Sequence, residues 1–146
     1  MKIALFIAAF SLTFLACQKQ VTSNQPTDPT LSGNWKMIFV EDNQSGSATA
    51  KPASTPGDVI ITFSPFTATP GIFYGHTPTN DISQSEYTVG ANHLLTVLNL
   101  AMTKVAETSW GAEFVDNIRD AKSYNFEKNG NLSITTINKT LIFQRQ

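Results

Sequence analysis

The sequence predicts a mainly β domain: a small antiparallel β-barrel, or strongly curved sheet, of about eight strands with one α-helix packed across it. Three observations support this fold class. Apolar residues alternate with period two through most of the chain, as half-buried strands require. One segment alone has the spacing of a helix face. The length of 146 residues suits a single folded domain.

The expected strands are short runs separated by turn residues. The first two are "NWKMIFV" and "DVIITFS", followed by "GIFYG", "SEYTV" and "HLLTVLNLA". Three more close the chain, "SYNFEK", "NLSITT" and "KTLIFQR", and the dipeptide Asn129-Gly130 predicts a hairpin between two of them. Alternation in the first two strands places these side chains on the core face: Trp35, Met37, Phe39, Val59, Ile61 and Phe63.

The single helix is expected within "VAETSWGAEFVDNIRDA", where Ala106, Trp110, Phe114 and Ile118 recur four residues apart. Gly111 lies inside this segment and costs the helix about 1 kcal/mol relative to alanine. We therefore expect the helix to be stabilised by docking Trp110 and Phe114 on the sheet.

A polar cluster precedes the helix in "TKVAET". Thr103 is expected to cap the helix, with an incomplete capping box because Ala106 stands at its third position. Lys104 and Glu107 are three apart, a spacing that suits a surface ion pair worth a few tenths of a kcal/mol. Together with Thr108, these residues are interpreted as specifying the fold rather than forming a binding site.

The first residues have the layout of a secretory signal peptide, with Lys2 followed by an apolar run that ends at Ala16 and is too short to span a membrane. Cys17, the one cysteine of the sequence, follows directly. This arrangement resembles the lipobox of bacterial lipoproteins, which implies that Cys17 is the lipid attachment site and carries acyl chains such as palmitate. Gln18, where Asp would retain such a protein at the inner membrane, implies the outer membrane. The alternative is an unmodified cysteine within a discarded leader.

These features divide the chain into a lipoprotein signal peptide (1–16), a lipidated cysteine with a flexible tether (17–30) and a folded domain (31–146). The tether prediction rests on its polar composition and two prolines. Residues 41–58 are rich in Gly, Ser, Ala and Pro and predict a long exposed loop. With Cys17 acylated, the mature domain has no thiol, which excludes disulfides, thiolate catalysis and cysteine metal sites.

Three stretches together resemble the META/HslJ family of small secreted or lipid-anchored bacterial domains. The first is "LSGNWKMIFV", with a Gly-x-Trp start. The second is "FYGHTPTNDISQSEY", where Gly75, Asn80 and Tyr87 hold the places of a glycine, a turn asparagine and an aromatic. The third is "LAMTKVAETSWGAEFVDNI" with the closing hairpin that ends in "L-x-F-x-R". The resemblance spans residues 31–146.

The resemblance implies a compact barrel-like fold with one helix, and a role in envelope maintenance or stress tolerance without an established catalytic residue. The more familiar version of the family carries Gly-Cys-Asn in its middle motif and another cysteine before the helix. Here Thr79 precedes Asn80 and "TKVAET" has no cysteine. The disulfide of that version is therefore absent.

No enzyme site is predicted, although His76, Asp81 and Glu86 lie near one another in sequence and could supply an acid and a base. The segment "HTPTND" has the composition of a turn, which is the favoured interpretation. His93 is expected at the surface. Two histidines and scattered carboxylates have no metal-ligand spacing, so no metal and no cofactor is expected.

The sequence therefore predicts a non-enzymatic, lipid-anchored envelope protein that contacts another envelope component. A lipocalin-like carrier of a small hydrophobic ligand inside the barrel is the alternative, and a hydrolase is the third. The expected partners are the membrane, through acyl chains on Cys17, and an envelope protein or a small hydrophobic ligand. Ordinary composition, with 14% charged residues and a net charge of −1, gives no indication of nucleic-acid binding. We expect a monomer.

Overall fold

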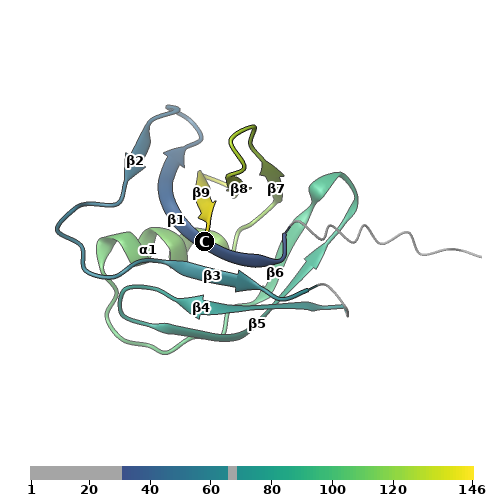
Figure 1. Ribbon diagram of the computed structural model, residues 1–146, viewed down its shortest axis with the longest axis horizontal. Coiled ribbons are helices and arrows are strands. Elements are labelled where there is room, and N and C mark those ends of the chain that lie inside the picture. The colour runs from purple at the N-terminus through teal and green to yellow at the C-terminus, as the bar shows by residue number, and fades with distance from the viewer. Residues whose placement is uncertain (1–30, 66–68) are drawn as a thin grey trace, which may run out of the picture.

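The computed structural model describes residues 31–65 and 69–146. The predicted signal peptide, the lipid attachment site Cys17 and the predicted tether lie outside the described residues. Figure 1 shows the arrangement of the elements. In chain order they are β1 (Gly33–Asp42), β2 (Ala48–Ala50), β3 (Ile60–Phe63), β4 (Gly71–His76), β5 (Asp81–Val89), the short 3-10 helix η1 (Ala91–His93), β6 (Leu95–Asn99), α1 (Ser109–Ile118), β7 (Ser123–Phe126), β8 (Leu132–Thr135) and β9 (Lys139–Arg145).

The strands form one antiparallel sheet in the order β6-β5-β4-β3-β1-β9-β8-β7, with β2 added to β1. The two ends of this sheet meet where β6 and β7 begin. There the Leu95 N–H donates to the Lys122 carbonyl at 3.1 Å, and Leu94 pairs with Ser123 in an isolated bridge. The fold is a nearly closed antiparallel barrel of eight strands with one helix, which confirms the predicted class.

The interior of the barrel is filled by large side chains. Val59, Ile61 and Phe63 are all buried, as their alternation predicts. The Phe63 ring packs edge-on against Tyr87 with centroids 5.0 Å apart, and lies 5.6 Å from that of Phe73. Burial raises the pKa of the Tyr87 hydroxyl to about 12. A packed aromatic interior is what holds the curved sheet together.

The prediction that Phe39 faces the core is wrong. Trp35 and Met37 are buried as expected, but the pairing of β1 with β9 shifts register between Met37 and Phe39. An extra residue in one strand moves every later side chain to the opposite face. Phe39 is therefore 40% exposed, whereas Val40 is 4% exposed and faces inward.

Residues 41–58 are less irregular than predicted. β1 continues to Asp42, and β2 returns beside it with Ala50 opposite Phe39 and Ala48 opposite Glu41. All three residues of β2 are exposed. Figure 1 shows β2 projecting from the barrel on the side where α1 lies.

The helix docks on the sheet as predicted. Trp110, Phe114 and Ile118 are buried, and Phe114 packs edge-on against Phe143 with centroids 6.4 Å apart. Ala106, by contrast, was expected on this face but precedes the helix and is exposed. Within residues 31–65 and 69–146, no helix combines the length and hydropathy that crossing a membrane requires.

The Asn129-Gly130 hairpin is also confirmed. It joins β7 to β8, with Gly130 at φ 84° and its N–H donating to the Glu127 carbonyl at 2.9 Å. The Asn129 side chain accepts from the Asn131 N–H at 2.9 Å. Glycine supplies the left-handed backbone and asparagine the local hydrogen bond that this turn needs.

Candidate functional site

The residues considered for acid-base chemistry do not converge. His76 and Asp81 face each other as the last pair of the β4–β5 hairpin, and both are exposed. Glu86 lies five residues further along β5, roughly 16 Å away at the rise of an extended strand. The segment between His76 and Asp81 is a turn closed by the Thr77 N–H, which donates to the Asn80 carbonyl at 2.8 Å.

His93 lies at the surface, at the end of η1. Its ring stacks on that of Tyr124 with centroids 5.0 Å apart. The stack lies beside the seam where the two ends of the sheet meet. In the described part of the chain, no group of three His, Cys, Asp or Glu residues is placed to hold a metal ion.

Asn80 organises the segment that precedes the helix. It is buried, and its amide oxygen accepts from the Val105 N–H at 2.7 Å while its amide nitrogen donates to the Val105 carbonyl at 2.9 Å. The side chain thus pairs with Val105 as a neighbouring strand would. Its oxygen also accepts from the Thr103 hydroxyl at 3.0 Å. Residues 103–105 are therefore held by tertiary contacts and cannot start the helix.

Thr108, and not Thr103, caps the helix, which corrects the prediction. Its side chain accepts from the Gly111 N–H at 3.1 Å. The predicted ion pair between Lys104 and Glu107 is also wrong, because the Glu107 carboxylate faces the β4–β5 turn. It accepts from the Thr79 hydroxyl at 2.7 Å, from the Asn80 amide at 2.9 Å and from the Thr77 hydroxyl.

The Glu107 carboxylate also accepts from the Thr108 N–H at 2.9 Å, at the start of the helix. Partial burial alone would raise the pKa of Glu107. The hydrogen bonds from Thr77, Asn80, Thr79 and Thr108 outweigh burial and hold this pKa below its ordinary value. We call these residues the Glu107 cluster. Every polar group in it has a partner, which supports the interpretation as fold specification.

Gly111 makes room for this carboxylate. A Cβ atom at Gly111 would lie 2.2 Å from both the Cδ and the Oε1 atoms of Glu107, far inside van der Waals contact. The glycine that weakens the helix by its propensity is thus required by a tertiary contact.

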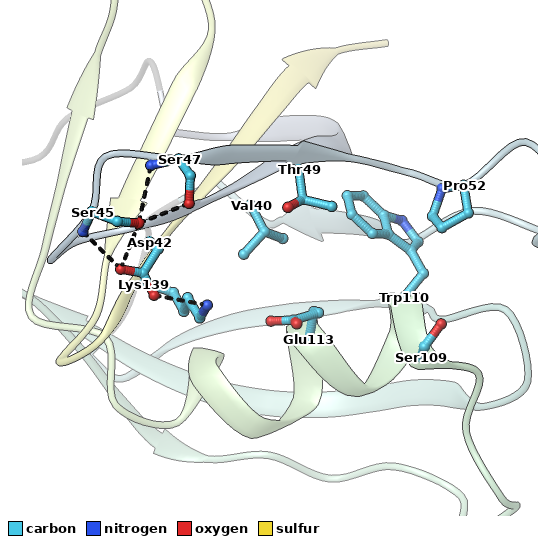
Figure 2. A pocket seen from close by; sticks show the side chains of 10 residues that line it. All are labelled: Val40, Asp42, Ser45, Ser47, Thr49, Pro52, Ser109, Trp110, Glu113 and Lys139. Atoms are coloured by element: carbon cyan, nitrogen blue, oxygen red, sulfur yellow. Dashed lines mark hydrogen bonds and ion pairs between the residues drawn. The ribbon is translucent and has the colours of Figure 1, made fainter.

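A recess of about 340 Å³ lies between β2 and α1. Figure 2 shows the helix on one side of it and the β1–β2 hairpin on the other. The sequence did not predict this site. The residues that line it are Val40, Asp42, Ser45, Ser47, Thr49, Pro52, Ser109, Trp110, Glu113 and Lys139.

An ion pair closes one end of the recess. The Lys139 ammonium lies 3.1 Å from Asp42 Oδ2, while Asp42 Oδ1 accepts from the backbone N–H groups of Ser45 at 2.9 Å and Gln44 at 3.1 Å. The Ser45 N–H, the Lys139 ammonium and the Gln44 N–H lower the pKa of Asp42 to about 2. Asp42 is therefore charged, and both of its carboxylate oxygens have partners.

Two polar groups of the lining lack a partner. Trp110 is 2% exposed, and its indole nitrogen has no hydrogen-bond acceptor among the described residues. Glu113 is half-buried, and its carboxylate makes no hydrogen bond or ion pair with any described residue; in Figure 2 the side chain lies across the recess from Val40. Buried hydrogen-bond donors are nearly always paired, so the unpaired indole of Trp110 marks this recess as a candidate binding site.

Sequence reasoning missed this site because its lining comes from β1, β2, α1, β9 and the loops on either side of β2. The sequence predicts a core position for Trp110, and a loop where β2 lies. One signal was available in the sequence. If the alternation of the first predicted strand is continued two residues beyond its end at Val40, Asp42 falls on the same face of the strand as Val40.

No family model matches this chain, and no curated protein matches it. The resemblance to the META/HslJ family therefore stays a prediction. Among solved structures, the chain is similar to an NMR structure of a protein from Burkholderia xenovorans, with a TM-score of 0.56 and 16% identity over 99% of each chain. At that identity the similarity shows the fold alone: a mainly β, nearly closed barrel with one helix.

Proposed function

We propose that this protein is a non-enzymatic, lipid-anchored domain of the cell envelope that acts by binding another envelope component on the outside of its barrel. The contact surface of this proposal is the face formed by β2 and α1. The role in envelope maintenance or stress tolerance comes from the META/HslJ resemblance of residues 31–146.

The packed interior is the observation that carries this proposal. Phe63, Phe73 and Tyr87, on the neighbouring strands β3, β4 and β5, pack there with ring centroids between 5.0 and 6.3 Å apart. Trp35 on β1 and Phe126 on β7, strands that are not neighbours in the sheet, have ring centroids 5.9 Å apart. A carrier of the lipocalin type needs an interior volume of several hundred Å³. The recess of about 340 Å³ lies instead between the β1–β2 hairpin and α1, against Trp110. This supports external contact over carriage of a ligand in the interior.

The dispersed titratable groups support a role without catalysis. His76 and Asp81 are exposed at one end of the β4–β5 hairpin, and Glu86 lies far along β5. A general acid and base must both reach the same substrate atoms within hydrogen-bond distance. The position of Cys17 directly after an apolar leader supports anchoring through acyl chains.

Anchoring is tested by Cys17→Ser in the native host. We expect the variant to leave the membrane fraction, or to accumulate with its signal peptide uncleaved, because two acyl chains are what hold such a protein on a bilayer. Metabolic labelling with a palmitate analogue, followed by fractionation, measures this. A variant that still incorporates the label and sediments with membranes would contradict the anchor.

Contact is tested by site-specific photocrosslinking in intact cells. A photoreactive amino acid in place of Thr49, on β2 at the recess, is expected to capture an envelope component reproducibly. The matched position is Lys128, which is exposed in the β7–β8 turn and does not line the recess. Capture from Thr49 that is lost in the Cys17→Ser chain supports the proposal. Equal capture from Thr49 and Lys128 argues against this face as the contact surface.

A further inference from the structure

We propose that the recess between β2 and α1 binds a small organic cation: a protonated amine that also carries a hydrogen-bond acceptor oxygen and an apolar group. The inference rests on the proposed function in using the same surface, and adds the chemical class that the surface recognises.

The charges of the lining favour a cation. Asp42, Glu113 and Lys139 are its charged residues, two negative and one positive. Lys139 and Asp42 neutralise each other across 3.1 Å. The carboxylate of the half-buried residue Glu113 then remains as the uncompensated charge, without a partner in the described residues. A charge-assisted hydrogen bond from an ammonium group is the strong interaction available to it.

The orphaned indole of Trp110 calls for an acceptor. Indole nitrogen only donates, and a buried donor without a partner loses the hydrogen bond that it had with water. In Figure 2 the nitrogen lies on the side of the ring toward Pro52, another residue of the lining. Trp35 shows the usual outcome, since its buried indole donates to the Leu31 carbonyl at 2.8 Å. An oxygen atom of the ligand would accept the corresponding hydrogen bond from the Trp110 indole.

The remaining lining suits the apolar part of such a ligand. Val40 and the Trp110 ring are apolar and buried, and Pro52 flanks them. The hydroxyls of Thr49 and Ser109 have no hydrogen bond within the described residues and are free to orient toward a polar ligand atom. The volume of about 340 Å³ falls at the lower end of the range for small-molecule sites, so the ligand is small.

The test uses 2-amino-1-phenylethanol as probe, because it combines an ammonium, a hydroxyl and a phenyl group. The full-length chain, labelled with ¹⁵N at tryptophan and held in nonionic detergent, is titrated while the two indole N–H resonances are followed. We expect a saturable shift of the Trp110 resonance. The Trp35 resonance is the internal reference and should stay in place, because its partner is the Leu31 carbonyl.

Two related compounds separate the contributions of the probe. Phenethylamine lacks the hydroxyl, and 1-phenylethanol lacks the amine. We expect phenethylamine to bind more weakly than the probe and 1-phenylethanol to bind weakest. Equal affinity of all three would overturn the proposal, since neither the carboxylate nor the indole would then be recognising its group.

Glu113→Gln provides the decisive variant, with Asp116→Asn as its match. Both remove one negative charge from α1, but Asp116 is exposed and outside the lining. We expect Glu113→Gln to weaken binding of the probe about tenfold, the effect of losing a hydrogen bond to a charged group. Asp116→Asn should leave the affinity unchanged. Equal affinity in the wild type and Glu113→Gln, or no Trp110 shift at all, overturns the proposal.

The two proposals fail separately. Photocrosslinking from Thr49 that persists while the probe does not bind would overturn cation recognition alone. Specific binding of the probe without selective capture from Thr49 would overturn envelope contact at this face alone.

Discussion

Two carboxylates near the first turns of α1 have opposite surroundings. Glu107 accepts hydrogen bonds from Thr77, Thr79, Asn80 and the Thr108 N–H. Glu113 has no partner among the described residues. A polar group that is buried without a partner is costly, and natural folds accept such local conflicts at functional sites. The comparison distinguishes the Glu107 cluster, which stabilises the fold, from the recess between β2 and α1, which is suited to binding.

The two tryptophans repeat the contrast. Both are buried, and the Trp35 indole donates to the Leu31 carbonyl at 2.8 Å whereas the Trp110 indole donates to no described residue. Trp110 thus serves two purposes, since its ring is part of the core and its edge lines the recess. Four substitution experiments test these two comparisons, between the carboxylates and between the tryptophans.

Trp110→Ala should have the largest effect. Removal of a buried tryptophan ring lowers the free energy of unfolding by about 3 to 5 kcal/mol. Urea unfolding followed by circular dichroism measures this, with Ser109→Ala as the control because Ser109 is exposed beside it. An unchanged midpoint would show that the ring does not support the core.

Gly111→Ala tests the Glu107 cluster by whether it raises or lowers the free energy of unfolding. Helix propensity alone predicts that this free energy rises by about 1 kcal/mol. The structure predicts a loss of about 1 to 2 kcal/mol, because the new Cβ displaces the Glu107 carboxylate from its hydrogen bonds. In a Glu107→Ala background the same substitution should become stabilising. Stabilisation in the wild-type background would contradict the close approach of Glu107 to the helix.

The two tryptophans are compared directly by Trp35→Phe and Trp110→Phe. Each substitution removes ring volume, but only the first removes a hydrogen bond between described residues and weakens the contact with the Arg145 guanidinium, 4.6 Å from the ring centre. We expect Trp35→Phe to be more destabilising by about 1 kcal/mol. If the free energies of unfolding fall equally, the distinction between a paired and an orphaned indole loses its support.

The smallest effect is expected in the pH dependence of stability. The pKa of Glu107 is lower in the folded state than its ordinary value of 4.5, so the stabilisation is present above that pH and is lost as pH falls through the folded pKa. Between about pH 7 and about pH 3, Glu107→Gln should lose less stability than the wild type.

Identical pH profiles for the wild type and Glu107→Gln would contradict a hydrogen-bonded Glu107. The acidic loss of stability will not vanish in this variant. Asp42, whose pKa is lowered to about 2, and Asp58, whose pKa is lowered chiefly by Lys36 and then by Lys51, contribute to it in every chain.

Local pattern predicted those parts of the fold that are specified locally. Period-two alternation identified the buried face of β3, four-residue spacing identified the docked face of α1, and Asn129-Gly130 identified the β7–β8 hairpin. Prediction failed at Phe39 because one bulge reverses alternation, and the sequence of β1 does not reveal the bulge. It failed at Thr103 because the amide of Asn80, distant in sequence, holds Val105 out of the helix.

By itself, the sequence determined the class of the fold, since hydrophobic periodicity is a property of consecutive residues. It also supplied the prediction that Cys17 anchors the protein. Only the tertiary structure decided which polar groups are satisfied. Glu107 and Glu113 look alike in the sequence, and they differ because one faces the threonines of the β4–β5 turn while the other faces a recess built from four separate elements. Hydrogen bonding between distant segments depends on their arrangement in space, which no local pattern records.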